Sequence, residues 1–109
     1  MSQIGANPAA TRELYSGLIR IHVLYHACKG PIFGLEMIEE LFRHGYKLSP
    51  GTLYPMLHSL EQKGLLRSEK IRFRQRIRRV YRATSLGQRA LKTAKEKVNE
   101  LLRELLEDS

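Results

Sequence analysis

Apolar residues recur at helical spacing in several stretches of the chain, separated by glycine and proline. The first stretch predicts a helix from Thr11 to Cys28, which Lys29-Gly30-Pro31 brings to an end. Its apolar residues fall into two sets on partly different faces, so we expect two neighbours to cover this helix, one of them another chain. The first set is Leu14, Leu18, Ile21, Tyr25 and Cys28, and the second is Ile19, Val23 and Ala27.

Two more helices are predicted in the middle of the chain. One runs roughly from Phe33 to His44 and is capped by Gly45, with an apolar stripe of Leu35, Ile38, Leu41 and Phe42. The other follows Ser49 as N-cap and is closed by Gly64, with a buried face of Leu53, Met56, Leu57 and Leu60. Because an interior proline removes a backbone hydrogen bond, Pro55 predicts either a kink or a later start near Thr52.

The opposite face of this third helix is compact, rich in hydroxyl groups and free of acids before Glu61. Such a face suits insertion into the major groove of DNA, with backbone amides near the helix start available to phosphate. The alternative is an ordinary exposed helix face. The residues that we predict at DNA are Ser49, Pro50, Gly51, Thr52, Tyr54, Pro55 and His58, with Thr52, Tyr54 and His58 contributing to base readout.

Alternating residues in 65–73 and 77–83 predict an antiparallel hairpin with a turn near Arg74-Gln75-Arg76. A last helix is predicted over about 85–106, with Thr84-Ser85 at its start. Its apolar residues form a heptad seam of about two heptads, which suits pairing with a second chain, while packing on its own domain is the alternative. The seam consists of Leu91, Ala94, Val98, Leu101 and Leu105.

Charge is concentrated in the hairpin. The segment 65–82 carries eight basic residues against Glu69 alone, a net charge of +7 out of +8 for the whole chain. Such a concentration of like charge repels itself, and arginine dominates it. We therefore expect this segment to bind a polyanion, with nucleic acid as the first candidate, and not to be merely a solvated charged surface. The residues that we predict to contact DNA here are Arg72, Arg74, Gln75, Arg76, Arg78 and Arg79.

The 109 residues should form one domain, preceded by a flexible arm at residues 1–10. No apolar run approaches the ~20 residues that cross a bilayer, and no signal-peptide layout precedes the first helix, so we expect a soluble cytoplasmic protein without a membrane partner. The lone Cys28 excludes an internal disulfide and fits buried packing better than redox chemistry.

Enzyme chemistry is not indicated, because no phosphate loop, serine triad or carboxylate pair occurs, and we expect no cofactor. His22 and His26 are spaced four residues apart and could share a zinc or nickel ion, with Cys28 nearby in sequence. Two ligands do not make a site, so we expect no metal here. A metal-responsive regulator and a nonspecific nucleic-acid-binding or interaction module stay open as alternatives.

Helix, turn, helix and basic hairpin together form the layout of a winged helix-turn-helix, a mainly helical α+β fold. The sequence resembles the PadR-like transcriptional regulators, in particular the short subfamily with a single C-terminal helix. The segments that carry the resemblance are Gly30 to Glu36, Ser49 to Pro55, Leu57, Leu60 to Leu66, and Tyr81 to Thr84 with Gly87.

The resemblance implies a homodimeric repressor that binds a palindromic operator of double-stranded DNA, with a winged-helix unit at residues 11–84 and a C-terminal dimerisation helix at 85–109. It implies that the first and last helices of two chains interlock, and we expect the first helix to contribute Leu14, Leu18, Ile19 and Val23 and the last helix its seam.

Two departures from the family stand out. The family's wing commonly has a glycine at its tip, whereas residues 65–86 contain none, so the turn must be longer or hold Gln75 in a less favourable conformation. Some short members bind flat aromatic compounds against a tryptophan in the dimer groove. This chain has no tryptophan, so a small-molecule effector at the dimer interface would rely on Tyr15, Tyr25 or Phe33.

Overall fold

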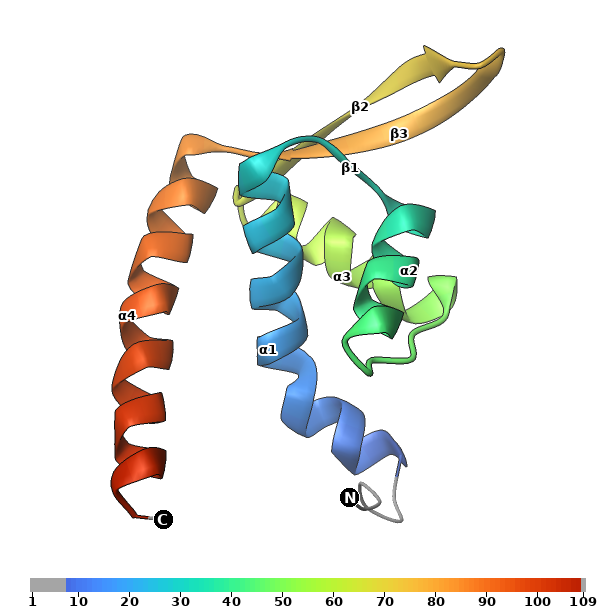
Figure 1. Cartoon of the computed structure of the whole chain (residues 1–109). Coiled ribbons are helices and arrows are strands. Elements are labelled where there is room, and N and C mark those ends of the chain that lie inside the picture. Colours follow the sequence, from blue (N-terminus) through green and yellow to red (C-terminus); the bar gives the residue numbers. More distant parts are fainter. Residues whose placement is uncertain (1–7, 109) are drawn as a thin grey trace.

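A computed structural model describes residues 8–108 of the protein (Figure 1). The elements are α1 (Pro8–Lys29), β1 (Ile32–Phe33), α2 (Gly34–Arg43), α3 (Pro50–Gln62), β2 (Leu66–Phe73), β3 (Arg76–Ala83) and α4 (Ser85–Glu107). This order confirms the helix-turn-helix followed by a hairpin and a long last helix. The first helix begins at Pro8 rather than Thr11, so residues 8–10 do not belong to an arm, while residues 1–7 of that predicted arm lie outside the described residues.

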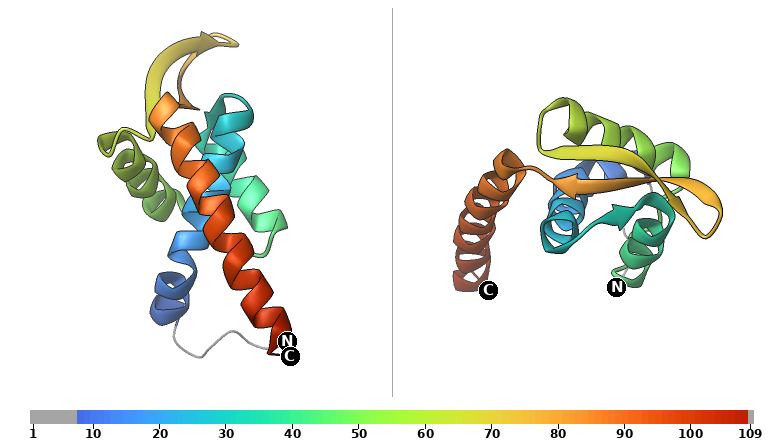
Figure 2. Two further views of the ribbon diagram at one scale, coloured as in Figure 1. Left: turned by 90° about the vertical axis from the view of Figure 1, so that its left-hand side faces the viewer. Right: turned by 90° about the horizontal axis from the view of Figure 1, so that it is seen from above.

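Helix α1 is the centre of the molecule. Helices α2 and α3 lie on one side of it, α4 runs beside it on the other, and the β2–β3 hairpin projects over α2 (Figures 1 and 2). The core between α1, α2, α3 and the base of the hairpin is apolar, and truncating one such side chain to alanine typically costs about 2–5 kcal/mol. Its fully buried side chains include Val23, Leu41, Leu53, Leu57 and Leu66.

The apolar stripe of α2 differs from the predicted one. Met37 and Leu41 face the core, whereas Leu35 and Phe42 are 54% and 59% exposed. The difference arises because the helix begins at Gly34, after Phe33 has paired in a strand, and packs through its 34, 37 and 41 positions. A prediction that takes every apolar residue as buried fails here, since apolar side chains also occupy protein surfaces.

Strand β1 was not predicted from the sequence. It is an edge strand of a three-stranded antiparallel sheet with the order β1-β3-β2, and it pairs Ile32 with Tyr81 and Phe33 with Val80. Two residues are too few to show an alternating pattern. The pairing ties the loop before α2 to the root of the hairpin.

The hairpin turn contains two residues, Arg74 and Gln75, both with positive φ, at 53° and 64°. These left-handed conformations belong to the tight turn that suits the twist of a hairpin, where asparagine and glycine are preferred. Of the two alternatives for a tip without glycine, the longer turn is therefore excluded. Gln75 adopts the less favourable conformation that a tip without glycine requires, and Arg74 does so as well.

The start of α4 is fastened to the end of α3. Thr84 Oγ1 donates to the carbonyl of Gly64 at 2.5 Å and accepts from the N–H of Gly87 at 3.0 Å, which caps the helix as predicted. A Cβ at Gly87 would overlap the carbonyl of Leu65, so only glycine fits this contact.

Within the described residues, no helix combines the length and the apolar composition that crossing a membrane requires.

Candidate nucleic-acid interface

The predicted outer face of α3 is exposed. Gly51, Pro55, His58 and Gln62 all face solvent, and the first turn carries no acid. Ser49 is the N-cap residue, but its side chain makes no capping hydrogen bond and lies 3.4 Å from Thr52 Oγ1 instead. The N-terminal half of α3 thus presents hydroxyl groups and uncompensated helix-start charge.

Helix α3 runs from Pro50 through Pro55 without a later start near Thr52. Because Pro55 has no N–H, the carbonyl of Gly51 lacks the donor that the residue four positions later normally supplies. Both residues are exposed, so Pro55 interrupts the helix hydrogen bonds on the side of α3 that faces solvent.

Tyr54 is placed differently from the other predicted readout residues. Its phenol ring lies against Gly34 at the start of α2, where a Cβ would overlap it, and the side chain is 39% exposed. Tyr54 therefore packs the two helices of the helix-turn-helix together. Its accessible part is smaller than a freely projecting tyrosine would offer to DNA.

A hydrogen-bond network fixes the hairpin to the end of α3. Glu61 Oε2 accepts from both the N–H and the hydroxyl of Ser68, at 3.1 and 2.8 Å, and Arg79 Nη1 donates to the same hydroxyl at 2.9 Å. Carboxylate acceptors strengthen such bonds. The network joins α3, β2 and β3, so the hairpin has a defined position relative to α3.

Arg78 anchors the other side of the hairpin. Its guanidinium lies 4.1 Å from the centre of the Phe33 ring and 5.8 Å from that of Phe73, and it donates to Glu36 Oε1 at 2.7 Å. The hydrogen bond from Arg78 lowers the pKa of Glu36, and the same bond raises the pKa of Arg78. Arg78, predicted as a DNA contact, is thus engaged within the protein.

The sequence did not reveal these anchors. Glu61, Ser68, Phe33 and Glu36 position the hairpin, yet each is an ordinary residue in its own segment, and only the tertiary fold brings it to its partner. The one available signal was Ser68, a small polar residue in a strand that also carries Arg67, Lys70 and Arg72.

Arginines at the outer end of the hairpin are exposed and, among residues 8–108, take part in no ion pair: Arg72, Arg74 and Arg76. Arg74 lies 5.3 Å from the centre of the Phe73 ring, and Gln75 is exposed at the tip. Nearer the base, the pairing places cations directly opposite each other, Lys70 against Arg79 and Arg67 against Arg82. Like charges at opposed positions destabilise a hairpin.

Four of the predicted dimer residues belong to α1, and the structure divides them. Leu14 and Leu18 are 73% and 44% exposed. Ile19 and Val23 are 2% and 0% exposed, because they pack in the core of their own chain, so placing them at a surface for a partner was wrong. The error arises because the sequence separates two apolar sets on α1 but does not show which of them packs in the core of its own chain, so the predicted interface took residues from both.

The predicted seam of α4 is half-buried near its start and open further on. Leu91 packs against the core, and Ala94 is half-buried. Val98, Leu101 and Leu105 are 40%, 54% and 59% exposed, and together with Leu14, Leu18 and Tyr25 of α1 they form the exposed apolar surface of the α1–α4 pair.

The aromatic candidates for an effector site are separate. Tyr15 packs edge-on against Tyr46, Tyr25 is exposed next to Lys29, and Phe33 is covered by Arg78. These side chains do not line one common cavity among the described residues. Cys28 is half-buried, and burial raises the pKa of its thiol, which is the opposite of a reactive cysteine.

Comparison with known proteins gives a consistent picture. Residues 23–93 match the model of the transcriptional regulator PadR-like family. The chain is 48% identical over 95 residues to the transcriptional regulator Rv3488 of Mycobacterium tuberculosis, and this alignment covers 87% of this chain and 89% of that protein.

Solved structures agree with the fold. A PadR family transcriptional regulator from Eggerthella lenta aligns with a TM-score of 0.77 and 29% identity, over 91% of this chain and 88% of the other. A PadR-like transcriptional regulator from Bacillus cereus aligns with a TM-score of 0.75 and 23% identity, over 86% and 96% of the two chains, and supports the fold alone.

Proposed function

The chain belongs to the PadR-like family of transcriptional regulators, which bind DNA and are not enzymes, and from this premise we propose that it is a homodimeric repressor of a palindromic operator. In this proposal, α3 of each chain enters the major groove of one half-site and the hairpin acts as the wing, contacting the flanking phosphates. An effector releases the dimer from DNA.

The observation that carries the proposal is the unpaired charge of the wing. Cations stand opposite each other at two positions of the hairpin. Of these four cations Arg82 has a carboxylate near it, that of Glu69 at 3.8 Å, and the arginines near the tip have no acidic partner in residues 8–108. This arrangement costs stability in the free protein, and neutralisation by phosphate recovers it together with the release of counterions.

The base-reading surface consists of the exposed start of α3. Gly51 and His58 are exposed there and Thr52 is half-buried, with Ser49 and Pro50 exposed at the helix start. We assign Tyr54 chiefly to packing α3 on α2, and Arg78 and Arg79 to holding the wing, which leaves phosphate contact to Arg72, Arg74, Gln75 and Arg76.

The dimer would form through α1 and α4. Both helices carry exposed apolar side chains, and a second copy related by two-fold symmetry can cover them. In this arrangement residues 85–109 are the dimerisation helix and residues 11–84 the DNA-binding unit. The spacing between the two copies of α3 would set the half-site separation.

Selection of binding sites from a random duplex DNA library, with a parallel RNA pool, tests the proposal. A palindromic DNA consensus is the expected result. Salt-dependent binding without a consensus, or a preference for RNA, would instead indicate a nonspecific nucleic-acid-binding module and refute operator recognition.

The wing is tested with the pair Arg74→Ala and Arg76→Ala in one protein. Affinity should fall for all DNA sequences, and the slope of log K against log salt should shrink by about 0.9 per lost phosphate contact. Arg89→Ala with Arg103→Ala removes the same charge from the face of α4 opposite its seam. An equal change in slope for both proteins would mean that net charge, not the wing, determines affinity.

A further inference from the structure

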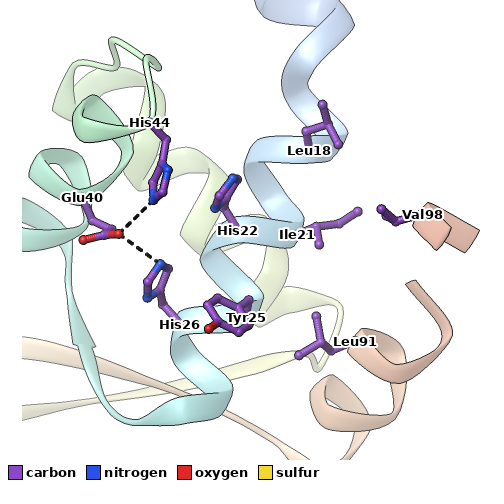
Figure 3. Close-up of a pocket in the computed structure, with 9 residues that line it drawn as sticks. All are labelled: Leu18, Ile21, His22, Tyr25, His26, Glu40, His44, Leu91 and Val98. Atoms are coloured by element: carbon purple, nitrogen blue, oxygen red, sulfur yellow. Dashed lines mark hydrogen bonds and ion pairs between the residues drawn. The ribbon is translucent and has the colours of Figure 1, made fainter. Parts of the chain in front are cut away.

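Three of the four histidines in the chain lie together at the junction of α1 and α2 (Figure 3). His22 and His26 come from α1, and His44 follows the last turn of α2. One nitrogen of each ring lies within 4.8 Å of a nitrogen of the other two. The sequence showed only the pair on α1; the third histidine arrives through the packing of α2.

Glu40 holds two of these rings. Its Oε2 lies 3.0 Å from His44 Nε2 and 3.5 Å from His26 Nε2, while its Oε1 accepts from Arg43 at 2.5 Å. A carboxylate that receives an imidazole N–H is the usual second partner of a metal-binding histidine. The rings of His22 and His44 stand 4.8 Å apart at an angle of 34°, and both point toward the same space.

We propose that His22, His26 and His44 bind one transition-metal ion, with Glu40 positioning His26 and His44. Imidazole is a ligand of zinc, copper and nickel, and a set of three leaves a coordination position for water. Zinc at ~2.0–2.1 Å from each nitrogen separates tetrahedral ligands by about 3.4 Å, so nitrogens that now lie within 4.8 Å of one another approach by up to about 1.4 Å when the ion binds. His44 is exposed, which gives it the freedom to move inward.

Burial, followed by the charges of His44 and His26, lowers the pKa of His22, which favours the neutral ring that a metal ion needs as a ligand. A groove of about 500 Å³, lined by the cluster and by Leu18 and Val98 among others, opens at this place between α1 and α4. An ion can therefore reach the histidines from solvent.

Binding would join the end of α2 to the middle of α1. The helix-turn-helix includes α2, and α1 carries part of the proposed dimer surface, so the ion would act on the relation between the DNA-reading units of the two chains. This regulatory consequence rests on the proposed function. Metal binding itself does not.

Cobalt(II) and zinc(II) are the probes, used with protein that carries no polyhistidine tag. We expect one ion per chain with a dissociation constant of about 1 μM or tighter, and a visible cobalt spectrum of low coordination number that zinc abolishes. His44→Ala should abolish the spectrum, and Glu40→Gln should weaken binding by about 10- to 100-fold. His58→Gln, which removes the remaining histidine on the exposed face of α3, is the matched control and should bind the ion normally.

Unchanged ion binding in His44→Ala, or loss of binding in His58→Gln, would overturn the site. With a DNA duplex selected as above, the ion should then change affinity by about 5- to 150-fold, and not in His44→Ala. Stoichiometric binding with unchanged DNA affinity would confirm the site and overturn its regulatory role. Failure to select any duplex would refute the proposed function, while the cobalt titration would still decide the metal site.

Discussion

The opposed cations of the wing predict that one substitution will stabilise the protein and weaken its binding to DNA. Lys70 lies directly opposite Arg79 across the β2–β3 pair, on the face of the hairpin that also carries Ser68. Lys70→Glu replaces repulsion by attraction at this position. It also lowers the net charge of residues 65–82 from +7 to +5.

The size of the effect follows from cross-strand pairs, which are worth about 0.2–1 kcal/mol each. Exchanging an unfavourable pair for a favourable one should raise the free energy of unfolding by about 0.5–1 kcal/mol. The gain is small because both residues are exposed to solvent, which screens their interaction. In urea this corresponds to a rise of about 0.3 M in the midpoint. Affinity for duplex DNA should fall and the salt slope should shrink, because the wing around the phosphate-contacting Arg72 loses two positive charges.

Urea unfolding at one fixed protein concentration and DNA titrations at several salt concentrations measure the two effects. Lys70→Gln, which only removes the repulsion, should lie between the parent and Lys70→Glu in stability. Arg103→Glu on α4 makes the same change of charge away from the wing and should leave the salt slope unchanged. If Lys70→Glu lowers stability, or leaves DNA binding as it was, the account of the wing as a self-repelling cationic surface that binds a polyanion is wrong.

The other predictions concern the turn, the dimer, the helix contact and the histidines. Gln75→Gly relieves a left-handed φ of 64° and should stabilise the protein by about 1 kcal/mol in thermal or urea unfolding, and a loss of stability would contradict the turn geometry. Leu101→Glu should convert the dimer to monomer in sedimentation experiments, whereas Arg103→Glu should not; a dimer that persists in Leu101→Glu would exclude this surface. Gly34→Ala drives a methyl group into the ring of Tyr54 and should cost about 1–3 kcal/mol of stability, so a neutral result would show that the ring can move aside. Folding lowers the pKa of His22 below 6.5, so its contribution to stability is complete above pH 6.5 and is lost as the pH falls toward the folded-state pKa. His22→Gln should therefore flatten the pH dependence of the free energy of unfolding, measured with a chelator present. An identical pH dependence in the parent and the variant would contradict the lowered pKa of His22.

Local patterns were sufficient for most of the fold. The glycines at 45 and 64, both with positive φ, end their helices where the sequence predicted, and Ser49 and Thr84 begin the next two. These signals act within a few residues, so sequence alone displays them. Strand β1 escaped because its two residues are a strand only through their pairing with β3.

The site was predictable in its chemistry and less so in its geometry. Seven arginines and one lysine in a hairpin indicate a polyanion wherever the side chains point. Which arginines are available depends on partners that are distant in sequence, such as Glu36, which pairs with Arg78 across 42 positions. The same limit concealed His44, whose neighbours on α1 are about 20 positions away.

Helix α1 explains how such distant groups can influence one another. At about 100° per residue, its core face, centred on Val23, its histidine face, with His22 and His26, and its exposed apolar face, with Leu18 and Tyr25, follow each other around the axis. The histidine face thus lies between the side that packs on the helix-turn-helix and the side proposed to meet a second chain. A group bound there must affect both the position of α2 and the orientation of α1 in the proposed dimer. Regulation through this face therefore needs no long path through the core, because a rotation of one helix is enough to change the distance between two recognition helices.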